Sequence, residues 1–379
     1  MGRSLTVVLG AALALASCKD RRTPPVPAPS VSPAPSAAPP AEPLPERAVS
    51  GEAAFELLAL DDGALLAWGG PTGLAVAVLD AAGRARGEPL AVPGAPREPV
   101  VEIAGASLGS RVGLAWASRS EKGAASFGAL GDAETRAFSS AFALSDATLG
   151  DVTRRGHVAL AVSDKAEMVA LVRVRDEPCS DSGGPTCAQY RFRELLPTGV
   201  EPRGLPMSVP SPCAPGHAGL VLVKDRWHYG FCSEGSGQPE VTTFMRQLSP
   251  FYVGVAKPAP GCTPLGALRL DADALFVFQC GDAPRAVRIG GLESGERSVD
   301  LSRLTLECVL GRPRFTAPGL ALDLSAAASG LGPLLPVSFG GGAARAAWTG
   351  SALLVASWVK GRVSLRRYEC RGAELARTG

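Results

Sequence analysis

The residues in this sequence that are best suited to chemistry are its nine cysteines. A thiol can be acylated, can bind a metal or can form a disulfide, and its spacing and compartment decide among these. Cys18 stands apart from the others, at the end of an apolar stretch, Leu5–Ala16, that follows the basic residue Arg3. The other eight lie between Cys179 and Cys370. Because eight is even, they can pair completely in an oxidising compartment and leave Cys18 for another modification.

The N-terminal segment predicts export and membrane anchoring. The stretch Leu5–Ala16 is too short to span a bilayer as a mature helix, and its place after a basic residue is typical of a secretory signal peptide. The ending Leu15-Ala16-Ser17-Cys18 resembles the lipobox of bacterial lipoproteins. This resemblance implies that residues 1–17 are a lipoprotein signal peptide, cleaved before an acylated Cys18. The alternative is a plain signal peptide followed by a chance cysteine.

Residues 18–50 predict a disordered tether that is rich in Pro, Ala and Ser. Proline fixes φ and removes a backbone donor, so neither a helix nor a sheet can propagate through this segment. Its apolar side chains are too few to offset the entropy of ordering. We expect a spacer between a lipid-anchored cysteine and a globular body, with the protein located in the cell envelope at the outer membrane, facing either the periplasm or the surface. The alternative is a proline-rich ligand for aromatic grooves.

Four disulfides are expected in the body of the protein. Cys179 and Cys187 can meet across Gly183-Gly184-Pro185 with little strain. Two further pairs each bracket one predicted hairpin with similar spacing, and the last follows by elimination. The remaining pairs are thus Cys213–Cys232, Cys262–Cys280 and Cys308–Cys370. Connectivity cannot be deduced from a sequence alone, so other pairings stay open.

The segment Asp181 to Pro185 (Asp-Ser-Gly-Gly-Pro) resembles the nucleophile loop of chymotrypsin-like serine proteases. This resemblance implies a nucleophilic Ser182 and backbone donors for an oxyanion. However, Ser180 replaces the glycine that supplies one of these donors, and the only upstream histidine, His157, lacks the Ala-Ala-His-Cys context of that family. We therefore interpret residues 179–187 as a hairpin loop closed by a local disulfide.

The other candidate side chains do not predict a catalytic, metal or cofactor site. Metal-ligand spacing is lacking among the three histidines, His157, His217 and His228. Asp61-Asp62-Gly63 and Asp271-Ala272-Asp273 could supply paired carboxylates, but acidic residues and glycine between apolar runs are typical of tight hairpin turns. We expect these residues to be structural.

Composition predicts a globular body without affinity for nucleic acid. About 46% of the residues are apolar and 20% are charged, which is ample for a core. The net charge of +2 provides no electrostatic footprint for nucleic acid.

Residues 51–379 predict an all-β fold built from repeats. One unit recurs: a Gly, Asp or Pro turn followed by a short apolar strand. Seven such strands are expected at Ala64–Trp68, Val112–Trp116, His157–Val162, Trp227–Cys232, Ala274–Cys280, Leu320–Leu324 and Ala352–Trp358. The two tryptophans Trp68 and Trp116 occupy matching places, about 48 residues apart. A period in the forties with several short strands per unit resembles β-propeller repeat proteins as a class.

We therefore expect a β-propeller of seven blades, with six or eight as possible numbers. A large β-sandwich or two smaller β-domains are the alternatives. We expect an insertion around residues 179–187, between the third and fourth units. We also expect the ring to be closed by a C-terminal strand that pairs with Phe55-Glu56-Leu57-Leu58.

Function is predicted only in outline. A non-catalytic binding or scaffold module is favoured, whose partner is another envelope protein or a polysaccharide contacted in part through residues 176–193. A lyase or glycosidase with its site at the mouth of the propeller channel is the alternative, and a spacer without a ligand is a third reading. The enzyme reading requires charged and aromatic residues that converge from several turns at one end, and fold alone does not decide this.

Overall fold

The structure is a computed structural model, and it describes residues 54–70, 73–145, 158–163, 165–178, 186–210, 212–223, 226–233, 238–245, 262–270, 273–280, 283–290, 296–323, 344–359 and 362–379. The chain divides into two compact units, Met1–Pro39 and Pro40–Gly379, and every described residue belongs to the second. The predicted signal peptide, Cys18 and the boundary at residue 50 lie outside the described residues. In the described part, no helix is long and apolar enough to cross a membrane.

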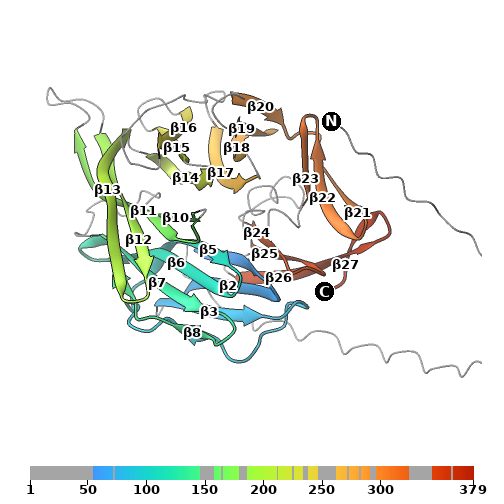
Figure 1. The fold of residues 1–379 in the computed structure, drawn as a ribbon, viewed down its shortest axis with the longest axis horizontal. Helices are drawn as coiled ribbons and strands as arrows, with labels where there is room; N and C mark the ends of the chain where they lie inside the picture. Colours follow the sequence, from blue (N-terminus) through green and yellow to red (C-terminus); the bar gives the residue numbers. More distant parts are fainter. Residues whose placement is uncertain are drawn as a thin grey trace, which may run out of the picture. The chain divides into compact units, whose positions relative to one another are not determined.

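The described strands form seven antiparallel sheets, each made of strands that are consecutive in the chain (Figure 1). The first two sheets contain β1 (Phe55–Leu60), β2 (Gly63–Gly70), β3 (Gly73–Leu79) and β4 (Leu90–Ala91), and then β5 (Val100–Leu108), β6 (Arg111–Ser120), β7 (Gly123–Asp132), β8 (Ala137–Phe138) and β9 (Phe142–Ala143). The third contains β10 (Val158–Val162), β11 (Met168–Pro178), β12 (Thr186–Leu196) and β13 (Gly199–Pro210). The fourth contains β14 (Pro212–Val223), β15 (Arg226–Ser233) and β16 (Gln238–Met245).

Three sheets follow in the C-terminal part of the chain. The fifth contains β17 (Cys262–Arg269), β18 (Asp273–Cys280), β19 (Ala283–Gly290) and β20 (Glu296–Asp300). The sixth contains β21 (Thr305–Val309), β22 (Arg312–Ala317) and β23 (Leu320–Asp323), and the last contains β24 (Ala344–Trp348), β25 (Leu353–Val359), β26 (Arg362–Arg371) and β27 (Glu374–Arg377).

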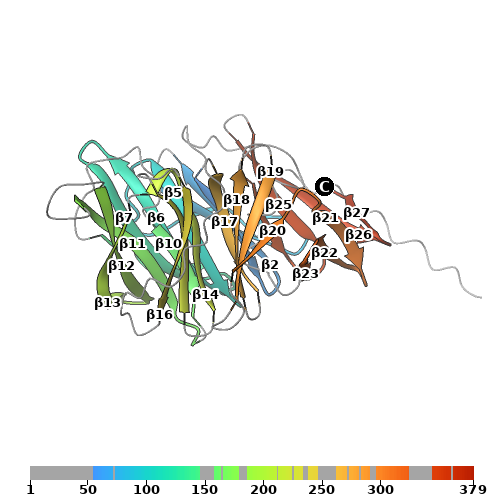
Figure 2. The same ribbon diagram turned by 90° about the horizontal axis from the view of Figure 1, so that it is seen from above.

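Six of the seven sheets are joined through their first strands. β24 contacts β1, β1 contacts β5, β5 contacts β10, β10 contacts β14, and β14 contacts β17. Figure 2 shows the sheets from above, with β5, β10, β14 and β17 labelled. The Ser107 hydroxyl on β5 donates a hydrogen bond of 2.6 Å to the carbonyl of Ala59 on β1. Radial sheets that meet at their first strands are the blades of a β-propeller. The all-β propeller is therefore confirmed over the sandwich and the two-domain alternative, and these contacts identify six blades.

The sheet β21–β23 accounts for the difference between the six blades identified and the seven blades expected. It packs by one face, with Phe315 and Leu322 in the core shared by β17–β20 and β24–β27. Its other face is polar, because cross-strand rows place Thr305 beside Thr316 and Glu307 beside Arg314. A blade within a ring is packed on both faces, whereas a sheet with one polar face covers a core from one side.

The strands recognised in the sequence are mainly the second strands of the blades. β2 is buried along its whole length, and Trp116 of β6 is fully buried. A second strand has a neighbouring strand on each side and a neighbouring sheet against each face, so its sequence is apolar throughout rather than alternating. This explains why Trp68 and Trp116 recur at matching positions.

The ring closes by side-chain packing rather than by the expected strand exchange. The prediction that Phe55–Leu58 pairs with a C-terminal strand is wrong, because β1 pairs with β2 and the last sheet is built from β24–β27 alone. Instead, the Arg345 guanidinium on β24 lies 3.2 Å from the Glu56 carboxylate on β1. The Thr349 hydroxyl also donates to the carbonyl of Ala81 at 3.1 Å, which links the last sheet to the first.

Candidate functional site

The third blade has strands that run well past the described part of its first strand. Among the described residues, β10 pairs with β11 from Val158 opposite Val172 to Val162 opposite Met168. β11 and β12 continue to pair as far as Pro178 opposite Thr186, and β12 pairs with β13 as far as Cys187 opposite Pro210. We call the part of β11–β13 beyond Val172 the projecting end of this blade; it includes the long strands at the left of Figure 1.

The expected insertion lies at the tip of this projecting end. Residues 179–185 connect β11 to β12, so they form the loop of a hairpin inside one blade, as expected for a hairpin loop. The prediction that the insertion separates two blades is wrong, because the sheet β10–β13 is continuous on both sides of it. The loop itself, with Cys179 and the Asp-Ser-Gly-Gly-Pro segment, lies outside the described residues.

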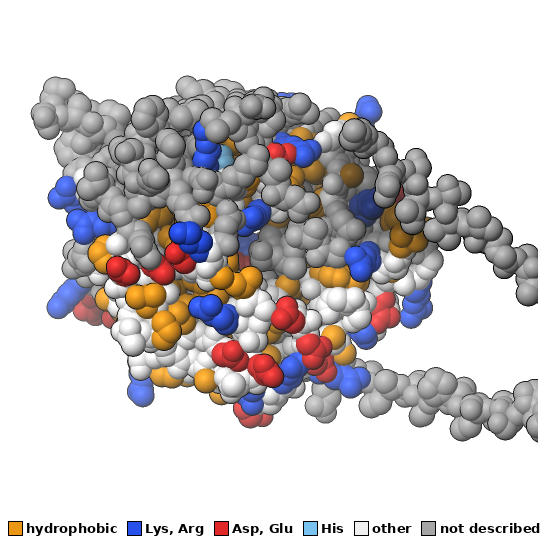
Figure 3. Space-filling model, viewed as in Figure 1, with side chains coloured by type: hydrophobic (Ala, Val, Ile, Leu, Met, Phe, Trp, Pro, Cys, Tyr) orange, Lys and Arg blue, Asp and Glu red, His pale blue; other side chains and the backbone are white. Residues whose placement is uncertain are grey.

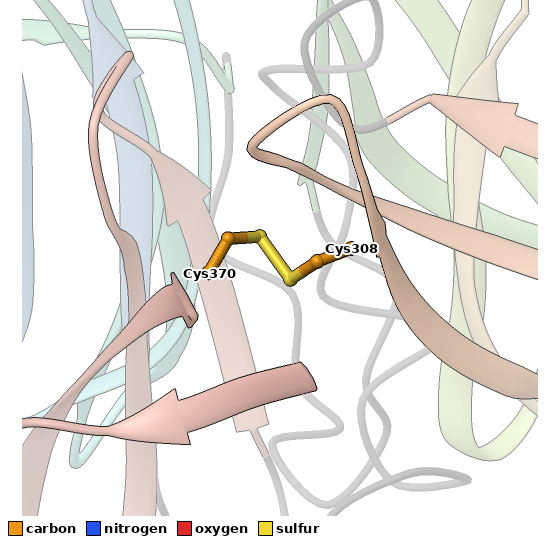
Figure 4. Close-up of a disulfide and its surroundings, with 2 residues drawn as sticks. All are labelled: Cys308 and Cys370. Atoms are coloured by element: carbon orange, nitrogen blue, oxygen red, sulfur yellow. A yellow bond between two sulfur atoms is a disulfide. The ribbon is translucent and has the colours of Figure 1, made fainter. Parts of the chain in front are cut away.

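One predicted disulfide is present. Cys308 of β21 and Cys370 of β26 are bonded, with their Cα atoms 5.6 Å apart (Figure 4). The bond joins the sheet β21–β23 to the last blade. The neighbouring backbone supports the same contact, because the Cys308 N–H donates to the carbonyl of Ala373 at 3.0 Å.

The remaining cysteine pairs stay predictions. Cys262 and Cys280 are direct partners in the β17–β18 ladder, and Pro212 opposite Ser233 brings Cys213 and Cys232 to adjoining positions. Directly opposed Cα atoms in antiparallel sheets are about 4.5–5.5 Å apart, within the range that a disulfide spans. The side chains of these cysteines lie outside the described residues.

An aromatic seam fixes the base of the projecting end against the next blade. The Tyr190 ring of β12 lies 5.4 Å from that of Tyr229 of β15, and the Phe192 ring lies 5.5 Å from that of Trp227. The Tyr229 hydroxyl donates to the Tyr190 hydroxyl at 3.1 Å. These rings belong to one buried cluster between the sheets β10–β13 and β14–β16. The projecting end is therefore attached to a rigid base.

Charged side chains on β5 and β11 change the pKa of Tyr229 in this seam. Burial, first of all, raises the pKa of Tyr229 well above its ordinary range, and the neighbouring Tyr190 and the negative charge of Glu102 on β5 raise it further. The cation of Arg173 on β11, a side chain that is only 1% exposed, acts in the opposite direction. Tyr229 consequently keeps its proton at physiological pH and serves as a hydrogen-bond donor, not as a base or nucleophile.

His228 takes no part in this cluster. It precedes Tyr229 on β15, so its side chain points to the opposite face of the sheet, beside Val221 and Thr243. Burial, aided by the positive charge of Arg226, lowers the pKa of His228 to about 4. His228 is therefore neutral near pH 7. His157 lies outside the described residues, as does the side chain of His217.

In the described part of the chain no group of three His, Cys, Asp or Glu side chains could hold a metal ion. Acidic and basic side chains are interspersed over the described surface in Figure 3. The acidic turn Asp61-Asp62-Gly63 is a hairpin turn, as expected, and Arg86 forms an ion pair with Asp62 there at 2.6 Å.

Sequence reasoning missed Glu102, Arg173, Tyr190 and Tyr229. Tyr190 and Tyr229 belong to different blades, and register irregularities adjoin Arg173 on β11 and Tyr190 on β12. Such bulges redirect side chains. The only signal in the sequence was that Arg173 follows the apolar run Met168–Val172 and that Tyr190 and Phe192 alternate with arginines on β12.

The sequence matches no known protein family, and no curated protein sequence matches it. Solved structures with similar folds include the β-propeller domain of the trilobed protease from Pyrococcus furiosus, which is 8% identical, with a TM-score of 0.44 over 86% of this chain and 97% of that chain. The Dos1 propeller is 16% identical, with a TM-score of 0.39 over 82% and 67%. The Hadza microbial sialidase Hz136 is 8% identical, with a TM-score of 0.47 over 83% and 64%. At these identities the similarity concerns the fold alone.

Proposed function

We propose that this chain is a lipid-anchored protein of the cell envelope that acts as a non-catalytic binding or scaffold module. Its partner is another envelope protein or a polysaccharide, contacted through the projecting end of the third blade. The observation that carries this proposal is the register of β10–β13, in which β11 continues from Arg173 to Pro178 beyond the last described residue paired with β10 and stays paired with β12.

Strands that extend beyond the rest of their blade need support to stay folded. Six residues of strand extend about 20 Å. An isolated hairpin is marginally stable in water, whereas three strands attached to a packed base are stable. The seam of Tyr190 and Tyr229 supplies that base. A rigid support that presents a loop reduces the entropy lost when a partner binds.

The test replaces residues 180–185 with a Gly-Ser sequence of the same length, so that the hairpin can still close. The matched control replaces Pro197-Thr198, the turn between β12 and β13 at the other end of the same strands. We expect the first variant to lose retention by immobilised envelope polysaccharide or capture of an envelope protein, and the control to keep it, with equal melting temperatures. If the first variant still captures every wild-type partner, the proposed contact is wrong. Hydrolysis of a glycan or peptide by the purified protein would favour the enzyme alternative.

The anchor is tested separately. We propose that Cys18 carries the lipid and is the first residue of the mature chain, on the strength of the Leu15-Ala16-Ser17-Cys18 sequence. The variant Cys18→Ser should move from the membrane fraction to the soluble fraction, because a single cysteine bears the acyl groups. A Cys18→Ser protein that stays in the membrane fraction contradicts the proposal.

A further inference from the structure

The hairpin between β21 and β22 presents a leucine to solvent. Leu310 is 98% exposed, and Leu108, at 43%, is the only other exposed large hydrophobic side chain among the described residues. The other described two-residue hairpin turns carry proline or small, polar or charged residues, as in Asp61-Asp62, Glu121-Lys122 and Pro197-Thr198. A large aliphatic side chain at a hairpin tip is therefore a departure from the pattern of the described turns.

The backbone at this tip is also unfavourable for leucine. Val309 pairs with Arg312, so Leu310 and Gly311 form a two-residue turn, and their φ angles are 51° and 76°. Positive φ at both positions is the requirement of a type I′ turn, where Asn, Asp and Gly are the usual residues. Leucine is strongly disfavoured there. A large apolar residue that is both exposed and strained indicates a role outside the folding of the domain.

A second hairpin lies beside this tip. The Cys308–Cys370 disulfide and the hydrogen bond from the Cys308 N–H to the Ala373 carbonyl hold the β26–β27 turn against β21. Arg312 and Arg371 are exposed at the two turns, and so is Glu374 opposite Arg371, which leaves a net charge of about +1 at this place. We call Leu310–Arg312 and Arg371–Ala373 together the paired tips. The disulfide holds the two turns next to each other before any contact is made.

We infer that the paired tips dock on an anionic lipid surface, with Leu310 entering the boundary between head groups and acyl chains and with Arg312 and Arg371 facing the phosphates. One leucine buries far less surface than the roughly 800 Å² per partner of a stable protein interface. A shallow apolar insertion with flanking cations is instead how proteins bind at a membrane interface. The inference rests on the proposed anchoring at Cys18, because an anchored protein meets the membrane at high effective concentration and needs only a weak additional contact.

The test uses the proposed mature chain, residues 18–379, with Cys18→Ser, so that neither an acyl group nor the apolar signal peptide contributes. Its partitioning is measured by co-sedimentation with vesicles of phosphatidylcholine alone and with vesicles that also contain phosphatidylglycerol. We expect weak binding that prefers the anionic vesicles, and a loss of about tenfold in the partition coefficient for Leu310→Asn, equivalent to about 1.4 kcal/mol. Arg312→Gln should remove most of the preference for anionic vesicles. The control, Leu108→Ser, should bind like the parent.

Three outcomes overturn the inference: no binding by the parent, unchanged binding of Leu310→Asn, or an equal loss in Leu108→Ser. Misfolding is monitored by the melting temperature, which should stay equal or rise in Leu310→Asn because asparagine tolerates positive φ. The failure of the anchor is distinguishable, since it is detected by fractionation of the protein with Cys18 intact, while the vesicle assay uses the unlipidated chain.

Discussion

The ion pair between Glu56 of β1 and Arg345 of β24 makes the closure of the ring testable. The Arg345 Nε lies 3.2 Å from the Glu56 Oε2, and the side chains are 31% and 18% exposed. The guanidinium carbon also lies 5.7 Å from the centroid of the Phe55 ring. Burial raises the pKa of the Glu56 carboxyl, and the cation of Arg345 counteracts that rise. Arg345 therefore stabilises a carboxylate that would otherwise be poorly hydrated.

The variant Arg345→Met keeps much of the side-chain volume and removes the cation. Breaking a fully buried pair costs about 3–5 kcal/mol, and an exposed pair contributes about 0–1 kcal/mol. Because about a third of Arg345 is exposed, we expect the variant to lose about 2 kcal/mol of unfolding free energy at pH 7. Chemical denaturation in urea measures this loss.

The pH dependence of the unfolding free energy lost in Arg345→Met shows whether the charge of Glu56 is the cause of that loss. A carboxyl whose folded pKa is raised contributes stability that is fully present below its ordinary value of 4.5 and is lost as the pH rises through the folded pKa. Without Arg345 the folded pKa of Glu56 rises further. The destabilisation should therefore be small near pH 4 and largest near pH 7. Glu56→Gln combined with Arg345→Met should recover most of it, because no charge is then left without its partner.

The matched control is Arg288→Met, which removes the partner of Asp273 within a single blade. The side chains of this pair are 35% and 15% exposed, close to those of Arg345 and Glu56. We expect a smaller loss than for Arg345→Met, since removing this pair breaks no contact between two blades. The reasoning is refuted if Arg345→Met loses the same free energy at pH 4 and pH 7, or if the double variant is no more stable than the single one.

Two further predictions concern stability. The pKa of His228 is about 4 in the folded protein and 6.5 in the unfolded chain, so the unfolding free energy should fall by up to about 3 kcal/mol as the pH drops from 6.5 to 4. The variant His228→Gln should flatten this part of a plot of unfolding free energy against pH. An unchanged plot would contradict the assignment. Replacing Cys308 and Cys370 together by alanine opens a loop with a sequence separation of 62. In the chain-entropy model this should lower the unfolding free energy by about 4 kcal/mol, which urea denaturation measures. A loss below about 1 kcal/mol would show that the sheet β21–β23 is held by packing alone.

The fold was predictable where a strand is buried on both faces. The segments Ala64–Trp68 and Val112–Trp116 lie within β2 and β6, and both segments are apolar throughout because a sheet covers each of their faces. The strand expected at His157–Val162 instead belongs to β10, a first strand, and the one at Leu320–Leu324 belongs to β23, a third strand. A count of apolar runs cannot distinguish these positions, because it does not show what packs against each run.

The candidate site was less predictable because its parts meet only through long-range register. Tyr190 and Tyr229 become hydrogen-bonded neighbours only when β12 and β15 pack against each other. The irregular register between Tyr190 and Phe192 further changes which residues face the seam. No local pattern encodes the packing of one blade on the next. By contrast, the hairpin around residues 179–185 was predictable, since its turn residues are local.

The sheet β21–β23 explains why the number of apolar units matched the number of sheets but not the number of blades. Seven apolar units were expected and the described residues form seven sheets, yet one sheet has a polar face with Thr305, Glu307 and Arg314 along its rows. That alternation was visible in the sequence, and it indicates a sheet that covers a core from one side. A sheet that packs by one face only has fewer contacts with the rest of the fold, and the Cys308–Cys370 disulfide links it covalently to the last blade. The same link holds the turn with the exposed Leu310 beside the β26–β27 turn, so the departure from regular blades coincides with the surface that we infer to meet the membrane.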